Sequence, residues 1–262
     1  MNVTTKLLAA ALAPLVIAGT ANATVVYEDT YEGDGLATNN GTGGGMTQRT
    51  IFQNAFSDAG SGLDSQASTN AARRAVVSTD NAFNLSEGFI LEVHYQVPGD
   101  VTGNGLFEWS MSPTNFTAGT QSEPVFSTFN GGTAGDQGNS QLAIGVAVGS
   151  FPEFGPGVYY NDGLGNDGTS VSALLTPAGL TAANTEVVTI LTVNADNTLS
   201  FSVDGDVTNG AHAFDLSNPL YFNVLAQPRG TVNFARITAI PEPSSLALLG
   251  LGGLLVARRR RG

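Results

Sequence analysis

The fold is decided by Gly88-Phe89-Ile90-Leu91-Glu92-Val93-His94-Tyr95-Gln96-Val97. Every second side chain from Phe89 onward is apolar, and three of the four positions between them are polar. Alternation of this length predicts a β-strand with one face in a core and the other near the surface. The turn residues Pro98-Gly99-Asp100 end the strand.

Other segments repeat this pattern on a shorter scale. Thr185–Val193 and Thr198–Val203 flank Asn194-Ala195-Asp196-Asn197, which predicts a β-hairpin, and Asp204-Gly205 follows as a second tight turn. Helical turns are candidates only at Asn70–Arg74 and Leu174–Ala183. The further strand candidates are Thr24–Glu28, Ala75–Thr79, Leu106–Met111, Pro124–Phe129, Gln141–Val148, Gly157–Tyr160, Leu220–Ala226 and Thr231–Ile240. Many short strands without alternating helices predict an antiparallel sandwich or barrel.

The C-terminal segment has the composition of a membrane tail. Pro241-Glu242-Pro243 excludes helix, and the uncharged stretch Leu246–Ala257 follows it. From Ser244 to Ala257 a helix would span roughly 20 Å, short of the ~30 Å hydrocarbon core. Four arginines come next: Arg258, Arg259, Arg260 and Arg261. Basic residues beside a span stay in the cytoplasm, so we expect the preceding chain to lie outside.

The N-terminal segment predicts export as well. Lys6 is followed by the apolar Leu7–Ala18, and Ala21-Asn22-Ala23 fits the A-x-A pattern of signal peptidase, with Thr24 as the new N-terminus. The predicted organisation is a signal peptide at 1–23, one domain at 24–239 and a tail at 240–262.

The charge of the domain restricts its partners. All 22 acidic residues lie between Glu28 and Glu242, where the only basic residues are five arginines. Such a surface repels nucleic acid and anionic lipid, so we exclude both as partners of the domain. The chain has no cysteine, which excludes disulfides and thiol chemistry.

The order of hinge, span and arginines resembles the PEP-CTERM sorting signal of Gram-negative envelope and biofilm proteins. The resemblance implies recognition by an exosortase-type membrane transpeptidase and release from the tail near Pro241-Glu242-Pro243. It also implies transfer from the inner membrane to the cell surface or the exopolysaccharide matrix.

A second resemblance concerns the domain. The strand Leu199–Val203 leading into Asp204-Gly205, and the last strand Val232–Ile237 before the tail, are similar to concanavalin A-like (laminin G-like) jelly rolls. The resemblance implies that the first and last strands pair. The predicted fold class is therefore all-β, an antiparallel jelly-roll sandwich flanked by a signal peptide and a short transmembrane helix.

The polar face of the first strand is the candidate glycan-binding surface. Glu92, His94 and Gln96 would form it beside Trp109, the only tryptophan, whose indole could stack on a sugar ring. The alternative interpretation places Trp109 in the core with its same-face neighbours Phe107 and Met111.

Catalytic patterns are absent from the sequence. A retaining glycosidase needs two carboxyl groups about 5–5.5 Å apart, and the strands holding Glu92 and Glu108 each offer one. A pair assembled across strands is the alternative. With two histidines and no His-Glu-x-x-His or Gly-x-Ser-x-Gly motif, we predict no catalytic residues and no catalytic zinc.

Two turns carry oxygen ligands suited to calcium. Asp204 and Asp206 begin an EF-hand-like stretch, but Asn209 stands where that loop requires glycine. Asp162 and Asp167 lie in a glycine-rich loop that fits no defined pattern. Calcium is therefore the one cofactor considered, with ordinary turns as the alternative.

These features predict an exported structural or carbohydrate-binding protein without catalytic activity. Its partners would be signal peptidase, the transpeptidase and extracellular polysaccharide. The alternative is a secreted glycoside hydrolase or lyase on the same jelly roll.

Overall fold

The computed structural model describes residues 23–33, 35–37, 41–50, 56–58, 62–65, 75–96, 106–117, 143–151, 155–161, 171–175, 186–226 and 231–241. The fold lies within the unit Ala23–Ile240. Its described residues form fifteen strands and no helix.

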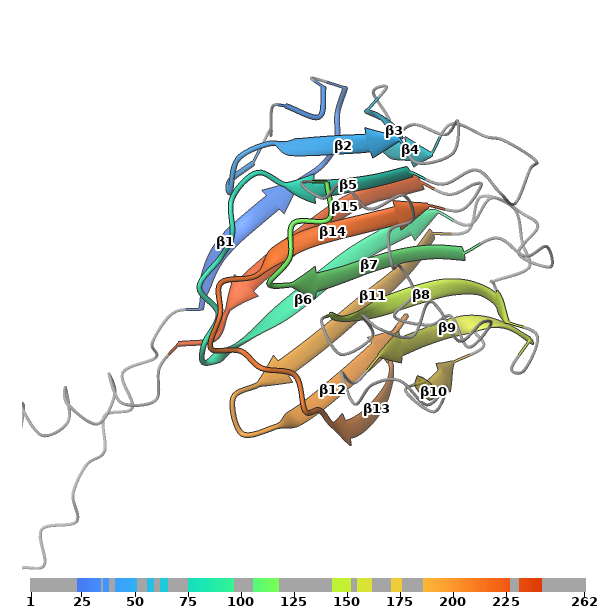
Figure 1. Ribbon diagram of the computed structural model, residues 1–262. Helices are drawn as coiled ribbons and strands as arrows, with labels where there is room; N and C mark the ends of the chain where they lie inside the picture. Colours follow the sequence, from blue (N-terminus) through green and yellow to red (C-terminus); the bar gives the residue numbers. More distant parts are fainter. Residues whose placement is uncertain are drawn as a thin grey trace, which may run out of the picture. The chain divides into compact units, whose positions relative to one another are not determined.

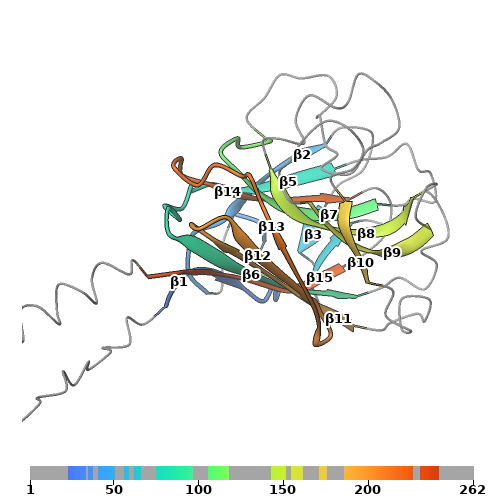
Figure 2. The same cartoon turned by 90° about the horizontal axis from the view of Figure 1, so that it is seen from below.

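The strands form two antiparallel sheets that face each other (Figures 1 and 2). Sheet A has the order β13-β12-β11-β6-β15-β4-β3, with β1 also paired to β15. Its strands are β1 (Thr24–Asp29), β3 (Phe56–Asp58), β4 (Leu63–Ser65), β6 (Gly88–Gln96), β11 (Glu186–Asn194), β12 (Thr198–Val203), β13 (Asp206–Ala211) and β15 (Thr231–Ala239).

Sheet B has the order β10-β9-β8-β7-β14-β5-β2. Its strands are β2 (Met46–Thr50), β5 (Ala75–Thr79), β7 (Leu106–Ser112), β8 (Ile144–Phe151), β9 (Gly155–Asn161), β10 (Val171–Leu175) and β14 (Tyr221–Ala226). Two such sheets confirm the predicted all-β sandwich.

The core lies between the sheets and follows from the alternation in the sequence. In β6 the odd-numbered side chains from Phe89 to Tyr95 are buried, and β7 contributes Phe107, Trp109 and Met111 from the opposite sheet. Tyr95 links the two layers, since its ring centroid lies 4.8 Å from that of Phe107 and 5.6 Å from that of Trp109. At roughly 25 cal/mol per Å² of buried apolar surface, these aromatic side chains contribute strongly to stability.

Most predicted strands occur close to their expected bounds. The hairpin of β11 and β12 and the pairing of the first strand with the last are both observed. Five strands had no sequence prediction: β2, β3, β4, β10 and β13. The predicted helical turn at Leu174–Ala183 is wrong at Leu174 and Leu175, which pair with β9 in β10. The predicted turn at 70–74 and strand at 124–129 lie outside the described residues.

Two buried tyrosines link the stability of the fold to alkaline pH. The Tyr27 side chain is fully buried with its Oη 3.1 Å from Tyr31 Oη, and Tyr95 is 2% exposed. Burial raises the pKa of both phenols, and at Tyr27 the neighbouring Tyr31 adds to this effect. A raised folded-state pKa means that stability is fully present below the unfolded pKa, near 10, and is lost as the pH rises above it.

We expect the free energy of unfolding to fall by about 1.4 kcal/mol per pH unit for each of these phenols above roughly pH 10. Tyr95→Phe removes one of these two ionisable phenols from the core. The fall in unfolding free energy per pH unit that the two phenols cause should therefore be about halved in this variant. Urea denaturation of both proteins across that pH range measures it. Equal slopes for the wild type and Tyr95→Phe would contradict the assignment.

Candidate functional site

The outer face of sheet A carries the predicted surface residues of β6. Glu92, His94 and Gln96 alternate with buried positions and are partly exposed, as the sequence pattern predicts. They face away from the core because successive side chains of a strand point to opposite faces.

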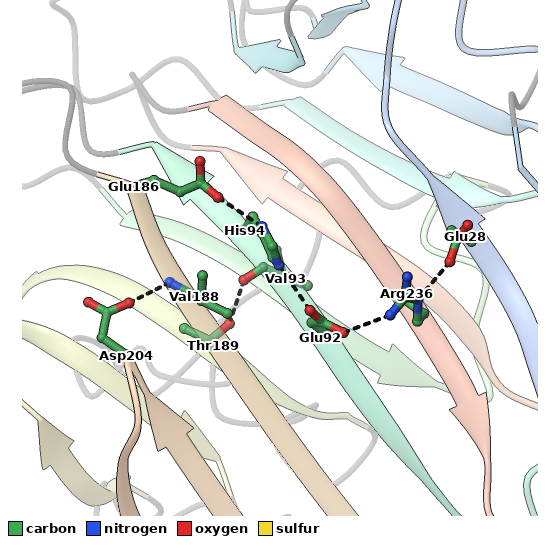
Figure 3. Close-up of polar contacts among 9 residues, drawn as sticks. All are labelled: Glu28, Glu92, Val93, His94, Glu186, Val188, Thr189, Asp204 and Arg236. Carbon is green, nitrogen blue, oxygen red and sulfur yellow. Dashed lines mark hydrogen bonds and ion pairs between the residues drawn. The ribbon is translucent and has the colours of Figure 1, made fainter. Parts of the chain in front are cut away.

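His94 is held between two carboxylates (Figure 3). Its Nδ1 lies 2.8 Å from Glu186 Oε1 on β11, and its Nε2 lies 3.0 Å from Glu92 Oε1. The two contacts fix the plane of the ring on the sheet.

Arg236 on β15 extends this array toward the first strand. Its Nε donates to Glu28 Oε2 at 2.6 Å and its Nη1 donates to Glu92 Oε2 at 3.3 Å. Figure 3 shows the resulting chain of polar and ionisable side chains crossing β1, β15, β6 and β11. These side chains are 25–48% exposed, so water screens each pair and each contributes little to stability. Their main effect is to order the side chains.

An aromatic ring lies within this array. Phe234 on β15 is the partner of His94 in the register, and their ring centroids are 4.9 Å apart in an edge-to-face contact. The guanidinium carbon of Arg236 lies 4.8 Å from the Phe234 ring centroid. We call Glu92, His94, Phe234 and Arg236 the Phe234 surface.

A β-bulge explains why sequence reasoning missed Phe234. Strict alternation would place Phe234 on the same face as Val232, which is buried in the core. The register between β15 and β6 shifts between Val232 and Phe234, so Phe234 lies partly exposed on the outer face. The asparagine between them is the only local signal in the sequence.

Trp109 does not belong to this surface. Its side chain is fully buried between the sheets, next to Phe107 and Tyr95. The interpretation that Trp109 lies beside Glu92 and His94 on an exposed face is wrong, because Trp109 alternates in phase with the apolar Phe107 and Met111. The alternative interpretation, a core tryptophan, is the observed arrangement.

The outer face of sheet B carries a second polar group that sequence reasoning missed. Ser78, Ser110 and Asn223 are neighbours across three strands, and all are buried. Ser78 Oγ donates to Asn223 Oδ1 at 2.6 Å. Glu108, 1% exposed, lies on the same face of β7 and is the one carboxylate in the described strands of sheet B. These strands therefore do not supply the second carboxyl group of a retaining glycosidase.

The calcium candidates fall into two groups. Asp204 Oδ1 accepts a hydrogen bond from the Val188 backbone at 2.8 Å, and Asp206 begins β13, whose extended backbone does not form an EF-hand loop. Within the described ranges no group of three histidine or acidic side chains is arranged so that it could hold a metal ion. Asp162 and Asp167 lie outside the described residues, and calcium binding stays a prediction.

The predicted processing sites lie at the borders of the described fold. Ala23 is exposed, β1 begins at Thr24, and β15 ends at Ala239 shortly before Pro241. Ala21, Glu242, Pro243 and the four arginines from Arg258 to Arg261 lie outside the described residues. Among the residues that are described, no helix has the length and apolar character needed to cross a membrane.

Comparison with solved structures defines the class of fold. The chain is similar to the Emp47p carbohydrate recognition domain, with a TM-score of 0.55 and 14% identity over 84% of this chain and 99% of that one. The Ca²⁺-bound exoplasmic/lumenal domain of VIP36 gives 0.54 and 11% over 82% and 89%. A structure from a study of endo-acting O-glycanases of human gut bacteria gives 0.50 and 12% over 83% and 100%. The fold is a concanavalin A-like jelly roll.

The tail is identified separately. Residues 239–261 match the PEP-CTERM protein-sorting motif. The motif implies export and processing by exosortase-type machinery in Gram-negative bacteria. A comparison with curated protein sequences found no relative.

Proposed function

We propose that this chain is a carbohydrate-binding protein of the cell surface or extracellular matrix. Signal peptidase would cut after Ala23, and the transpeptidase would release the domain, residues 24–239, near Pro241-Glu242-Pro243. The apolar segment Leu246–Ala257 would hold the chain in the inner membrane until that step. The ligand would be an extracellular polysaccharide.

The sorting motif supports the location. Residues 239–261 match the PEP-CTERM motif, and residues 1–23 have the pattern expected of a signal peptide. The motif does not specify a ligand.

One observation carries the binding proposal, namely a partly exposed aromatic ring surrounded by ordered hydrogen-bonding groups. The Phe234 ring could stack on the apolar face of a sugar, while Glu92, His94 and Arg236 could hydrogen-bond its hydroxyl groups. Gln96, two residues beyond His94 on the same face, would extend this surface. One similar structure is described as a carbohydrate recognition domain, and another as the Man3GlcNAc-bound form of the VIP36 lumenal domain, which supports the same class of ligand here.

A structural role for the same array makes a different prediction. If the ion pairs served only to tie β1, β15, β6 and β11 together, changing Phe234 would affect stability and not ligand binding. The two roles are separated by a substitution that keeps the apolar volume and removes the ring. Phe234→Leu is that substitution.

We expect the purified domain to bind a subset of polysaccharides on a glycan array. Phe234→Leu and Phe234→Ala should each lose up to about tenfold in affinity, because an aromatic ring contact is worth about 0.5–1.5 kcal/mol beyond the area that it buries. Isothermal titration measures this loss. Val207→Ala on β13, which removes a 59% exposed apolar side chain, is the matched control and should bind as the wild type does. Binding that is unchanged in Phe234→Leu would exclude this surface.

The enzymatic alternative rests on Glu108. Its carboxylate lies on the outer face of sheet B and is only 1% exposed, and burial suits a carboxylic acid to act as a general acid. A structure from the O-glycanase study has a similar fold. Release of new reducing ends from a polysaccharide by the wild type, and its loss in Glu108→Gln, would favour this function. Binding without cleavage supports the carbohydrate-binding proposal.

A further inference from the structure

The sorting motif begins inside the folded domain. The matched motif starts at Ala239, which is the last residue of β15. Ala239 is paired with Thr24 of β1 on one side and with Phe89 of β6 on the other. The next residue, Ile240, donates its backbone N–H to Gly88 O at 3.0 Å. Pro241 follows directly, so no spacer separates the last bonded residue from the Pro-Glu-Pro hinge.

The corner that holds Ile240 is closely packed. Gly88 has a φ of +110°, and a Cβ at this position would meet the backbone of Val193 and Asn194 and lie 3.1 Å from Ile240 Cδ1. Ala195 N donates to Glu87 O at 3.3 Å and closes the neighbouring turn. The start of β1 and the end of β15 lie side by side at this corner (Figure 1). We call Thr24, Gly88, Ala239 and Ile240 the tail corner.

A transpeptidase must hold the substrate backbone in its own cleft. A backbone N–H that bonds to the enzyme cannot at the same time bond within a sheet. Because processing takes place near Pro241, the residues just before it have to enter the cleft, and these are Ala239 and Ile240. In the fold they are already bonded to β1, β6 and Gly88.

The short distance between the domain and the membrane adds to this conflict between enzyme binding and folding. Five residues, 241–245, separate Ile240 from the apolar segment, and fully extended they reach at most about 18 Å. The domain would therefore stand against the enzyme and the membrane during processing. Little room remains for the enzyme to work without moving the end of β15.

We propose that the substrate segment of the sorting enzyme overlaps the fold, and that processing requires the end of β15 with Ile240 to separate from β1 and Gly88. The tail corner then sets the rate of release by how readily it opens. This inference rests on the proposed processing by the transpeptidase and is independent of carbohydrate binding.

A reversible lock on the corner tests the inference. Val25 and Thr238 are partners across β1 and β15, and both are at least partly exposed. The chain has no cysteine, so Val25→Cys/Thr238→Cys can form only one disulfide within the chain. We expect pulse-chase processing of the full chain in cells with the transpeptidase to slow about tenfold when the disulfide is formed, and to recover under reductant.

A spacer gives the opposite result. A flexible linker of six glycine and serine residues, inserted between Ile240 and Pro241, should speed processing. The enzyme can then bind extended backbone without opening the tail corner. The matched control carries the same linker between Asp204 and Gly205, in the exposed turn between β12 and β13. It should leave the rate of processing unchanged.

The outcomes are distinct. Processing that is insensitive to both the disulfide and the spacer would overturn the inference while leaving the sorting assignment intact. A wild-type chain that is never processed would overturn both. Glycan titration of the released domain reports on carbohydrate binding separately.

Discussion

Trp109→Ala is expected to destabilise the domain by about 4 kcal/mol, because removal of a buried indole leaves a cavity that the sheets cannot close. The side chain is fully buried, and it contacts Tyr95 and Phe107 in the layer where the two sheets meet. Val224 and Val146 are its neighbours on the flanking strands β14 and β8. A loss of this size is a large part of the stability of an ordinary domain.

Trp109→Phe removes the indole N–H and keeps an aromatic ring in the core, so it separates the effect of the polar group from that of the lost volume. The indole Nε1 is buried and makes no hydrogen bond with the part of the chain that the structure describes. Phenylalanine removes that polar group and keeps a ring, so we expect it to cost much less than alanine. Urea denaturation followed by circular dichroism measures both variants. Equal costs would mean that the indole is not packed as described.

Gly145→Ala is expected to lower the free energy of unfolding by about 3 kcal/mol or more, because the added methyl group overlaps atoms of the neighbouring strand. Gly145 lies on β8 opposite Ser110 of β7. A Cβ at this position would overlap the backbone oxygen of Trp109 and lie 2.6 Å from Ser110 Cβ. The strand β7 would have to move, and Trp109 with it.

Gly205→Ala is the control that isolates backbone strain from overlap. Gly205 has a φ of +92°, but a Cβ there has no atom within 4 Å. Its cost should be limited to the left-handed conformation, about 1–2 kcal/mol. Thermal unfolding of both variants provides the comparison. A Gly145→Ala variant as stable as Gly205→Ala would contradict the close approach of β7 and β8.

The sequence predicts the fold well where alternation is uninterrupted. Gly88–Gln96 and Thr198–Val203 have clean alternation, and their strands, pairing and buried faces follow from it. Short strands such as Phe56–Asp58 and Leu63–Ser65 have too few residues to show a period. Thr208–Ala211 contains Asn209 and Gly210, which are typical of turns, and is a strand because β12 pairs with it.

The candidate site shows where pattern reasoning fails. Glu92 and His94 are assigned to the correct face because β6 has no irregularity along its alternation. Phe234 is not, because one bulge reverses the face of every residue beyond it. Glu186, the second carboxylate on His94, comes from β11 and lies 92 positions from His94 in the sequence. Its approach depends on the register between β6 and β11. Such tertiary contacts leave no local signal.

The position of β15 also has a mechanical consequence. The strand lies inside sheet A, with β6 on one side and β4 and β1 on the other, and the chain leaves the domain from its end. Tension applied through the tail acts along this strand, perpendicular to its hydrogen bonds, so all of them are loaded in shear together. When the C-terminal end of β15 is instead lifted away from its neighbours, the same hydrogen bonds break one after another. The domain would therefore resist being pulled from its anchor and yield readily to an enzyme that lifts the last residues away.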